Sequence, residues 1–510
     1  MEKKMFLALA LSMLVLIGWP FLFNNKKNKT TVQETQTKEQ VQVAESSPIK
    51  ETPKVKITKM QGGQTYFIEN PYIKVGVNSK GATISQVVFK DYKDEHKNFI
   101  RFFGSDVETT GAVHISGLDN INMKARQNNP NEVSFYDDKG TEVSYVLDKD
   151  SYVISLSVKR SSKEALQFRV YSKVSDVSDE HYGLSEDPDK RKKEVLLYSV
   201  LQDKVERTEL KDILEKGVIY FTNTFKWAAI SDRYFMLAIL SDGKTMSDVS
   251  STCIQNERLC STSVSIKETG PVSNLKLFVG PKDVTYMRKV DPTLSEAIDY
   301  GWLSFISVPM LELMKFFYSI IANYGVAILI LTLLVRLLMF PLQHKAMKSM
   351  KTMQELQPHL KSLQEKYKDD KEKLNREMLS FMKTHKMNPM SGCLPILIQL
   401  PVFIALYKVL ANSVELYRSP FMFWITDLSM KDHYYILPLL MGGMMFVQQK
   451  MTPNPTMDPT QAKIMLYMMP VIFTVLMLNL PSGLTLYIMF STLLGIVQQI
   501  ATNKILEAKK

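Results

Sequence analysis

The feature that most constrains this chain is an apolar run from Tyr324 to Leu342, YGVAILILTLLVRLLMFPL, which contains Arg336. At the rise of an α-helix this run covers roughly 28 Å, close to the thickness of the hydrocarbon core of a bilayer. It is therefore predicted to be a transmembrane helix that carries a charge. Because a membrane-buried arginine costs about 2.5 to 3.5 kcal/mol even on lenient scales, Arg336 needs a partner, a water-filled space or a route to the interface.

The N-terminus contains another apolar segment, residues 1–23, which begins MEKK. No small-residue cleavage site follows it, which favours an uncleaved signal-anchor span over a cleaved signal peptide. Residues 24–60 are rich in Lys, Gln, Thr and Glu and almost lack aromatic residues, so they are predicted to form a flexible tether. The lysines before the anchor favour a cytoplasmic N-terminus, which places the following residues outside the cytoplasm.

Residues 61–290 have the period-two alternation of short strands. Clear examples are Ile73 to Val77, Ala82 to Phe89, Tyr152 to Val158, Glu194 to Val200 and Leu275 to Val279. Many such strands without intervening helices predict an all-β sandwich of two large antiparallel sheets. In an oxidising compartment, Cys253 and Cys260 could form a disulfide across the turn between them, although the spacing is equally consistent with free thiols.

This region has no convincing catalytic motif. Residues 76–83, GVNSKGAT, have Walker-like glycine spacing, but Ala82 occupies the position of the phosphate-binding lysine, so a turn is predicted. His96 and His181 each follow Asp-Glu and are interpreted as solvated loop residues rather than a general-base pair. The cysteine spacing does not suit zinc. We therefore expect no enzyme activity, no metal and no cofactor.

Residues 294–323 are hydrophobic enough to resemble a span. However, Ser304, Glu312, Lys315 and Ser319 recur at helical spacing, which is typical of an amphipathic helix in the interface. If this segment crossed the membrane, the basic loop after Leu342 would lie outside, against the positive-inside rule. An interfacial helix is therefore predicted before the span that contains Arg336.

The basic loop, residues 343–390, is predicted to be a cytoplasmic helical hairpin, because its apolar residues share helix faces and its charged residues lie outside. Its cations either form a solvated face or bind anionic lipids or ribosomal RNA. The residues proposed for such contacts are Lys361, Lys366, Lys371, Lys373 and Arg376.

Residues 391–510 contain four more apolar segments followed by a basic tail. The distribution of lysines favours a cytoplasmic C-terminus. The predicted fold class is thus an α-helical polytopic membrane protein with six spans, of which five form the core, plus an all-β domain outside the cytoplasm.

Several polar residues fall at similar depths in the predicted spans. Arg336 and Gln399 each lie about six residues, or roughly 9 Å, from the cytoplasmic end of their helix. Thr332 is one turn from Arg336, and the last span adds Tyr487, Ser491 and Thr492. Arginine can also extend to the interface, and Ser or Thr can bond to their own helix. Polar groups at one depth on separate helices favour a shared wet cavity.

These membrane segments resemble the YidC/Oxa/Alb family of membrane protein insertases, in its Gram-negative form with a large periplasmic domain. The resemblance rests on the run at Tyr324, on MNPMSGCLPILIQLPVFIALYKVL, on YYILPLLMGGMMFVQQKM, on DPTQAKIMLYMMPVIFTV and on LPSGLTLYIMF. It implies a hydrophilic groove that includes Arg336, Thr332, Gln399 and Tyr487, and a β domain like the galactose-mutarotase supersandwich. Family members often have a second tyrosine where this chain has Ile488.

The resemblance further implies an inner-membrane protein that inserts nascent membrane proteins and assists their folding, alone or with the Sec translocon. The expected partners are these clients, the ribosome, the Sec translocon and anionic lipids, without a small-molecule substrate. The alternative is a small-solute transporter, which also uses polar residues at mid-depth. Against it, the spans show no repeat symmetry and no deep acid. A membrane-tethered sugar enzyme would leave the spans unexplained.

Overall fold

The computed structural model describes residues 62–507 except 94–96, 104–112, 161–165, 174–192, 222, 242–245, 255, 257, 267–271, 368–369, 385–393 and 452–458. The predicted signal anchor and tether lie outside the described residues, as do Cys393, His96 and His181.

The N-terminal part is a β domain whose strands pair antiparallel throughout. The pairings divide the described strands into two sheets, joined only where Phe225 pairs with Met246. The first sheet contains β1 (Thr65–Glu69), β2 (Ile73–Asn78), β3 (Thr83–Lys93), β4 (Phe99–Arg101), β5 (Val113–Ile115), β10 (Leu166–Lys173), β13 (Val218–Phe221), β16 (Met246–Ile254) and β17 (Leu259–Ile266). The second contains β6 (Lys124–Asn129), β7 (Glu132–Tyr136), β8 (Glu142–Leu147), β9 (Val153–Lys159), β11 (Glu194–Ser199), β12 (Lys204–Glu209), β14 (Phe225–Ser231), β15 (Phe235–Ser241) and β18 (Val272–Pro281).

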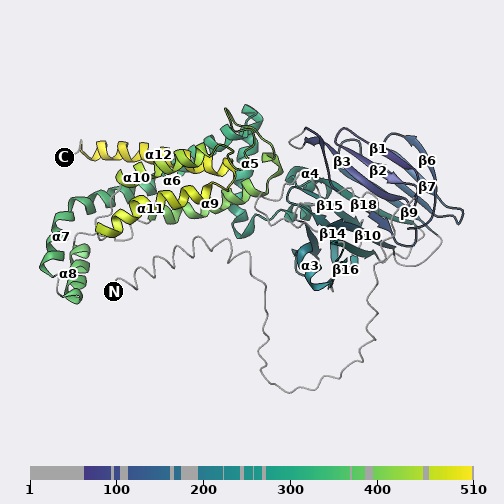
Figure 1. Cartoon of the computed structure of the whole chain (residues 1–510), viewed down its shortest axis with the longest axis horizontal. Coiled ribbons are helices and arrows are strands. Elements are labelled where there is room, and N and C mark those ends of the chain that lie inside the picture. The colour runs from purple at the N-terminus through teal and green to yellow at the C-terminus, as the bar shows by residue number, and fades with distance from the viewer. Residues whose placement is uncertain are drawn as a thin grey trace, which may run out of the picture. The chain divides into compact units, whose positions relative to one another are not determined.

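The two sheets pack face to face (Figure 1). Aromatic side chains meet between them. Phe89 of β3 stacks on Phe235 of β15 with ring centroids 4.5 Å apart. The buried hydroxyl of Tyr145, on β8, donates to the carbonyl of Ala82 at 2.6 Å. Alternate residues of β8 and β9 fill this interior, as the period-two pattern requires. The predicted antiparallel sandwich is thereby confirmed.

Two local features of the β domain extend the sequence analysis. The Walker-like segment consists of the end of β2 and the turn into β3, where Gly81 and Ala82 have φ of 70° and 50°. Cys253 and Cys260 are directly opposed on β16 and β17, and they form a disulfide. A short helix, α3 (Leu210–Lys216), interrupts the strands where no helix was predicted.

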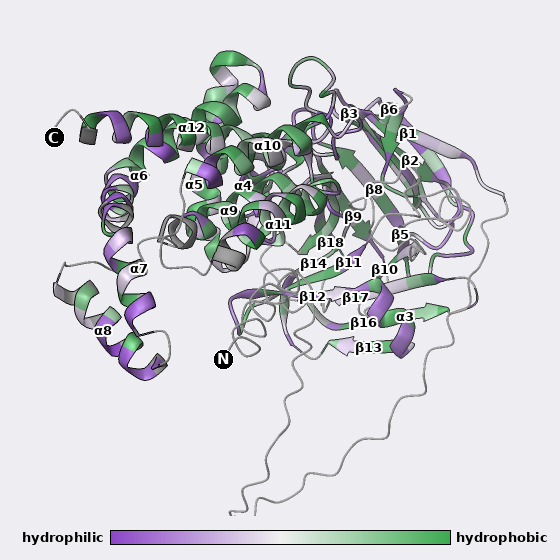
Figure 2. Ribbon diagram, turned by 60° about the vertical axis from the view of Figure 1, so that its left-hand side comes forward, coloured by the Kyte–Doolittle hydropathy of each residue, from purple (hydrophilic) through white to green (hydrophobic). Residues whose placement is uncertain are grey.

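The C-terminal part is helical. Its elements are α4 (Val284–Val290), η2 (Pro292–Ala297), η3 (Gly301–Leu303), α5 (Ser304–Ile321), α6 (Tyr324–Glu355), α7 (Gln357–Lys366), α8 (Lys371–Thr384), α9 (Leu394–Asn412), η5 (Val414–Leu416), α10 (Ile436–Met451), α11 (Pro459–Met477) and α12 (Ser482–Glu507). Figure 2 shows hydrophobic residues dominating α9, α11 and α12, whereas α7 and α8 carry many hydrophilic ones.

Three stretches of the described chain are long and apolar enough to cross a membrane: Gly301–Ile321, Tyr324–Ser349 and Ser482–Ile505. Gln399–Asn412 and Lys463–Met477 form shorter apolar helices. The first stretch contains α5, so length and composition allow a span where the amphipathic pattern predicts an interfacial helix. The basic hairpin is α7 and α8, but α6 continues well past Leu342, through Pro341, before α7 begins.

A partly buried ion-pair cluster connects the β domain to the helices. Lys315 of α5 lies 3.0 Å from Asp283, the N-cap of α4, and 3.1 Å from Glu415 of η5. Its amine also donates to the hydroxyl of Thr285 at 2.8 Å. Burial and the neighbouring Asp283 carboxylate raise the pKa of Glu415, while the charge of Lys315 opposes this shift. One lysine thus compensates two largely buried carboxylates.

The end of α9 and the segment after it make further contacts. The carbonyl of Ala411 in α9 accepts a hydrogen bond from Arg233 of the β domain, and Lys408 of α9 pairs with Asp299, between η2 and η3, at 3.0 Å. The ring of Tyr417 packs against Phe235, with centroids 6.4 Å apart. These contacts add apolar and polar links beside the cluster at Lys315.

We expect Lys315→Met to destabilise the folded protein by about 3 to 5 kcal/mol, because it leaves buried Asp283 and Glu415 without a counter-charge. When folding raises the pKa of a carboxyl, the folded protein becomes more stable as the pH falls through that pKa. Acidification should therefore reduce the loss of stability caused by Lys315→Met. Adding Glu415→Gln should recover part of it. Thermal unfolding in detergent at several pH values measures both effects.

Lys211→Met, at an exposed position on α3, is the matched control and should change stability by less than about 0.5 kcal/mol. Equal effects of Lys315→Met and Lys211→Met would contradict a stabilising role of the cluster.

Candidate functional site

Ser491 of α12 lies at the centre of a polar cluster that joins α6, α9 and α12. Its hydroxyl accepts a hydrogen bond from Arg336 Nε of α6 at 3.0 Å, and Gln399 Nε2 of α9 lies 3.5 Å from the same oxygen. Its carbonyl accepts a further bond from Arg336 Nη2. The structure thus brings Arg336 and Gln399 to one depth, as counting from the helix ends predicts.

Tyr487 belongs to the same cluster. It lies one turn before Ser491 on α12, and its hydroxyl accepts a hydrogen bond from Gln399 Nε2. Only 1% of Tyr487 is exposed. The amide of Gln399 therefore binds two hydroxyls of α12, and it fixes α9 against α12 through polar rather than apolar contacts.

Thr332 is buried but bonds elsewhere. Its hydroxyl donates to the carbonyl of Ile328 at 2.6 Å, within α6. Thr492 does the same with Ile488 of α12 at 2.8 Å. Both use the bond to their own helix that the sequence left open as an alternative. The hydroxyl of Thr332 therefore points along α6 rather than across the cluster, and its role in a groove stays a prediction.

Arg336 obtains neutral partners. Besides Ser491, its Nη1 donates to Gln343 Oε1 at 2.9 Å. Gln343 was not predicted as a site residue, although it is seven residues further along α6, on the same face. Glycine at position 495 was missed as well: a Cβ there would lie 3.4 Å and 3.6 Å from the two terminal guanidinium nitrogens. A membrane arginine needs a partner, a water-filled space or a route to the interface. In this structure Arg336 has hydrogen-bond partners.

Further polar contacts follow toward the C-terminal ends of α6 and α12. His344 Nδ1 lies 3.4 Å from the hydroxyl of Thr502, and Lys351 donates to the carbonyl of Asn503 at 3.2 Å. Gln499 donates to the carbonyl of Met451 at 2.7 Å. The polar cluster is therefore continuous with a polar end of the helices and lies next to their apolar middle.

The predicted cationic residues lie on α7 and α8. Lys366 and Lys373 are exposed, and each amine lies 5.4 Å from the centre of the Tyr367 ring. Arg376 is exposed and lies 3.6 Å from Glu372. For Lys361 and Lys371 only the backbone is described. These positions are compatible with an external partner and equally with a solvated face.

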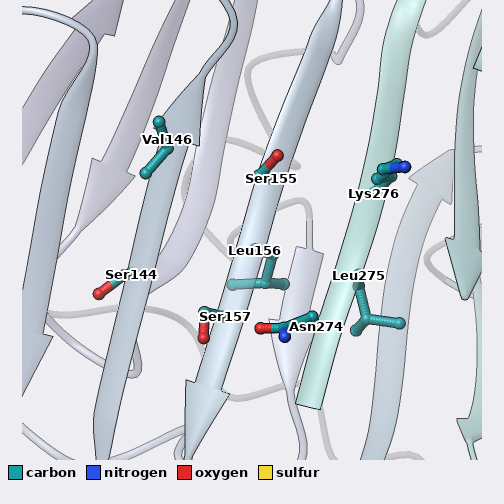
Figure 3. A pocket seen from close by; sticks show the side chains of 8 residues that line it. All are labelled: Ser144, Val146, Ser155, Leu156, Ser157, Asn274, Leu275 and Lys276. Carbon is teal, nitrogen blue, oxygen red and sulfur yellow. The ribbon is translucent and has the colours of Figure 1, made fainter. Parts of the chain in front are cut away.

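A shallow hollow lies on the outer face of the second sheet (Figure 3). A cross-strand row of small polar residues forms its floor, because Ser144 pairs with Ser157, and Ser157 pairs with Asn274. Val146 and Lys276 border this row. The lining contains no carboxylate or imidazole. It therefore lacks a general acid-base pair, and it gives no support to sugar chemistry.

Two family models match the chain: "YidC periplasmic domain" over residues 65–313 and "60Kd inner membrane protein" over residues 316–509. A protein from Geotalea uraniireducens strain Rf4, named membrane protein insertase YidC, is 34% identical, and the alignment covers 99% of each chain. A protein of the same name from Geotalea daltonii is also 34% identical, with 100% of each chain covered. A solved structure described as an active YidC insertase is 18% identical and covers 86% of this chain and 93% of its own, with a TM-score of 0.40.

We expect Tyr487→Phe to lower the stability of the protein by about 1 kcal/mol, because the partly buried amide of Gln399 loses one of its two hydroxyl acceptors. Tyr467→Phe removes the same atom from a side chain of α11 that is 59% exposed, and it should have little effect. Thermal unfolding of both purified variants in nanodiscs makes the comparison. Identical midpoints would contradict the stabilising role of the Gln399 contact.

Proposed function

The chain belongs to the YidC family of membrane protein insertases, and we propose that it inserts its clients through a groove built on the polar cluster at Ser491. The observation that carries the proposal is the meeting of Arg336, Gln399 and Ser491 from separate helices. Polar groups gathered inside apolar helices lower the cost of bringing a client's polar tail into the membrane.

In this mechanism the tail of a nascent protein enters the cluster from the cytoplasm, where hydrogen-bonding groups replace part of its hydration. The apolar segment of the client then moves into lipid along α9 and α11. Tyr467, Met468, Val471 and Val475 of α11 are exposed and form an apolar surface suited to this step. Flexible and aromatic side chains can adapt to many client sequences.

The energy for insertion comes from burial of the client's apolar segment and from the membrane potential. An acidic tail that moves outward across the inner membrane gains about 2.3 kcal/mol per charge for each 100 mV. Arg336 is bound by neutral partners, so its charge is not cancelled within the cluster. It can therefore attract a passing carboxylate.

The proposed topology places both termini in the cytoplasm, with six spans, an interfacial α5 and a periplasmic β domain. It exposes Lys366, Lys373 and Arg376 to the cytoplasm, where they can bind ribosomal RNA or anionic lipids. The proposal also includes assistance to client folding and action alone or with the Sec translocon, which rest on family membership. The relatives are named insertases, which favours insertion over solute transport.

We expect simultaneous substitution of Leu for Thr332, Gln399 and Arg336 to abolish insertion of a single-span client into proteoliposomes. Single substitutions should each retain part of the activity, because the remaining polar groups still lower the cost of tail entry. Protease protection of the client tail measures insertion.

The control replaces three exposed polar side chains outside the proposed groove and client surface, Ser304, Ser319 and Tyr434, with Leu. It should insert the client at the normal rate. Unchanged insertion by the groove variant would contradict the mechanism.

A further inference from the structure

The guanidinium of Arg336 is held in one orientation against α12 by residues outside the predicted groove. We propose that Gln343 and Gly495 are positioning residues for insertion: Gln343 orients the guanidinium, and Gly495 provides the space in which it lies. The inference rests on the proposed function. It concerns the position in which the charged guanidinium of Arg336 is held.

Gln343 has the chemistry for this task. It is 3% exposed, and its amide oxygen accepts from Arg336 Nη1 at 2.9 Å. Arginine can only donate hydrogen bonds, so it needs acceptors wherever water is scarce. A carboxylate would supply an acceptor but would cancel the charge. The amide of Gln343 binds the guanidinium and leaves its charge available to a client.

Gly495 determines how closely the guanidinium approaches α12. It is one turn beyond Ser491, so its amide is the helical partner of the same Ser491 carbonyl that Arg336 binds. A Cβ at position 495 would just touch the guanidinium, at 3.4 Å and 3.6 Å, and would come within 2.6 Å of the Gln448 amide nitrogen. A longer side chain that extended toward Arg336 would compete with the guanidinium for this space.

These contacts leave part of the guanidinium able to bind a further group. The hydrogen bonds to Ser491 and Gln343 engage Nε, Nη1 and Nη2 once each, and arginine carries a second N–H on each terminal nitrogen. Fixing the group before a client arrives lowers the entropy lost when a carboxylate binds to it. The chemical class recognised is therefore a client tail with an acidic side chain.

The experiment compares two single-span clients that differ only in an Asp or an Asn in the tail, inserted by full-length protein in proteoliposomes. Gln343→Met removes the acceptor at similar length, and it should slow the Asp client about fivefold while slowing the Asn client less. Gln343→Glu keeps an acceptor but cancels the charge, so it too should slow the Asp client selectively. Gly495→Leu should resemble Gln343→Met.

Two controls separate positioning from a general structural effect. Gly443→Leu, at a glycine of α10 where an added Cβ would meet open space, should insert both clients normally. In an Arg336→Leu background, Gln343→Met should cause no further loss, because its effect passes through the guanidinium. Equal slowing of both clients, or additive losses without Arg336, would overturn the inference. Failure of the unsubstituted protein to insert either client would instead refute the proposed function.

Discussion

A guanidinium inside an apolar helix is the constraint on which the membrane part of this protein depends. Arg336 cannot be left without acceptors in a medium of low polarity, and α6 itself supplies Gln343. Further acceptors come from Ser491 on α12, whose hydroxyl is also close to Gln399 of α9. Satisfying one arginine therefore holds α12 against α6, and Gln399 joins α9 to the same level through Ser491 and Tyr487. The same requirement creates the polar cluster on which the proposed insertion mechanism rests.

The connection to the β domain follows a related rule. Asp283 and Glu415 come from distant parts of the chain, and both are largely buried beside Lys315. Their mutual repulsion makes the central lysine necessary. Asp283 lies at the end of the β domain and caps α4, Lys315 lies on α5, and Glu415 lies after α9. The cluster therefore joins these three parts of the chain. The β domain is thus attached by charges as well as by the packing of Tyr417.

Much of the fold was predictable because the relevant signals are local. The alternation in β8 and β9 reflects one buried and one more exposed face, and a single strand is enough to show it. The helix bounds were less predictable. α6 continues past Pro341 because residues beyond the apolar run still favour a helix. Hydropathy indicates which residues suit the lipid, but it does not indicate where a helix ends. For α5, apolar length and amphipathic pattern point to different placements, and composition cannot choose between them.

The sequence by itself determined the two-part architecture, the membrane-buried arginine and the depth at which Gln399 could meet it. Helical rise is constant, so depth can be counted along each helix. Only the tertiary structure decided which groups touch. It made Ser491 the shared acceptor, turned Thr332 toward its own helix, and added Gln343 and Gly495. These outcomes depend on the rotation and separation of packed helices, which are set by all the side chains between them and leave no signal in any one segment.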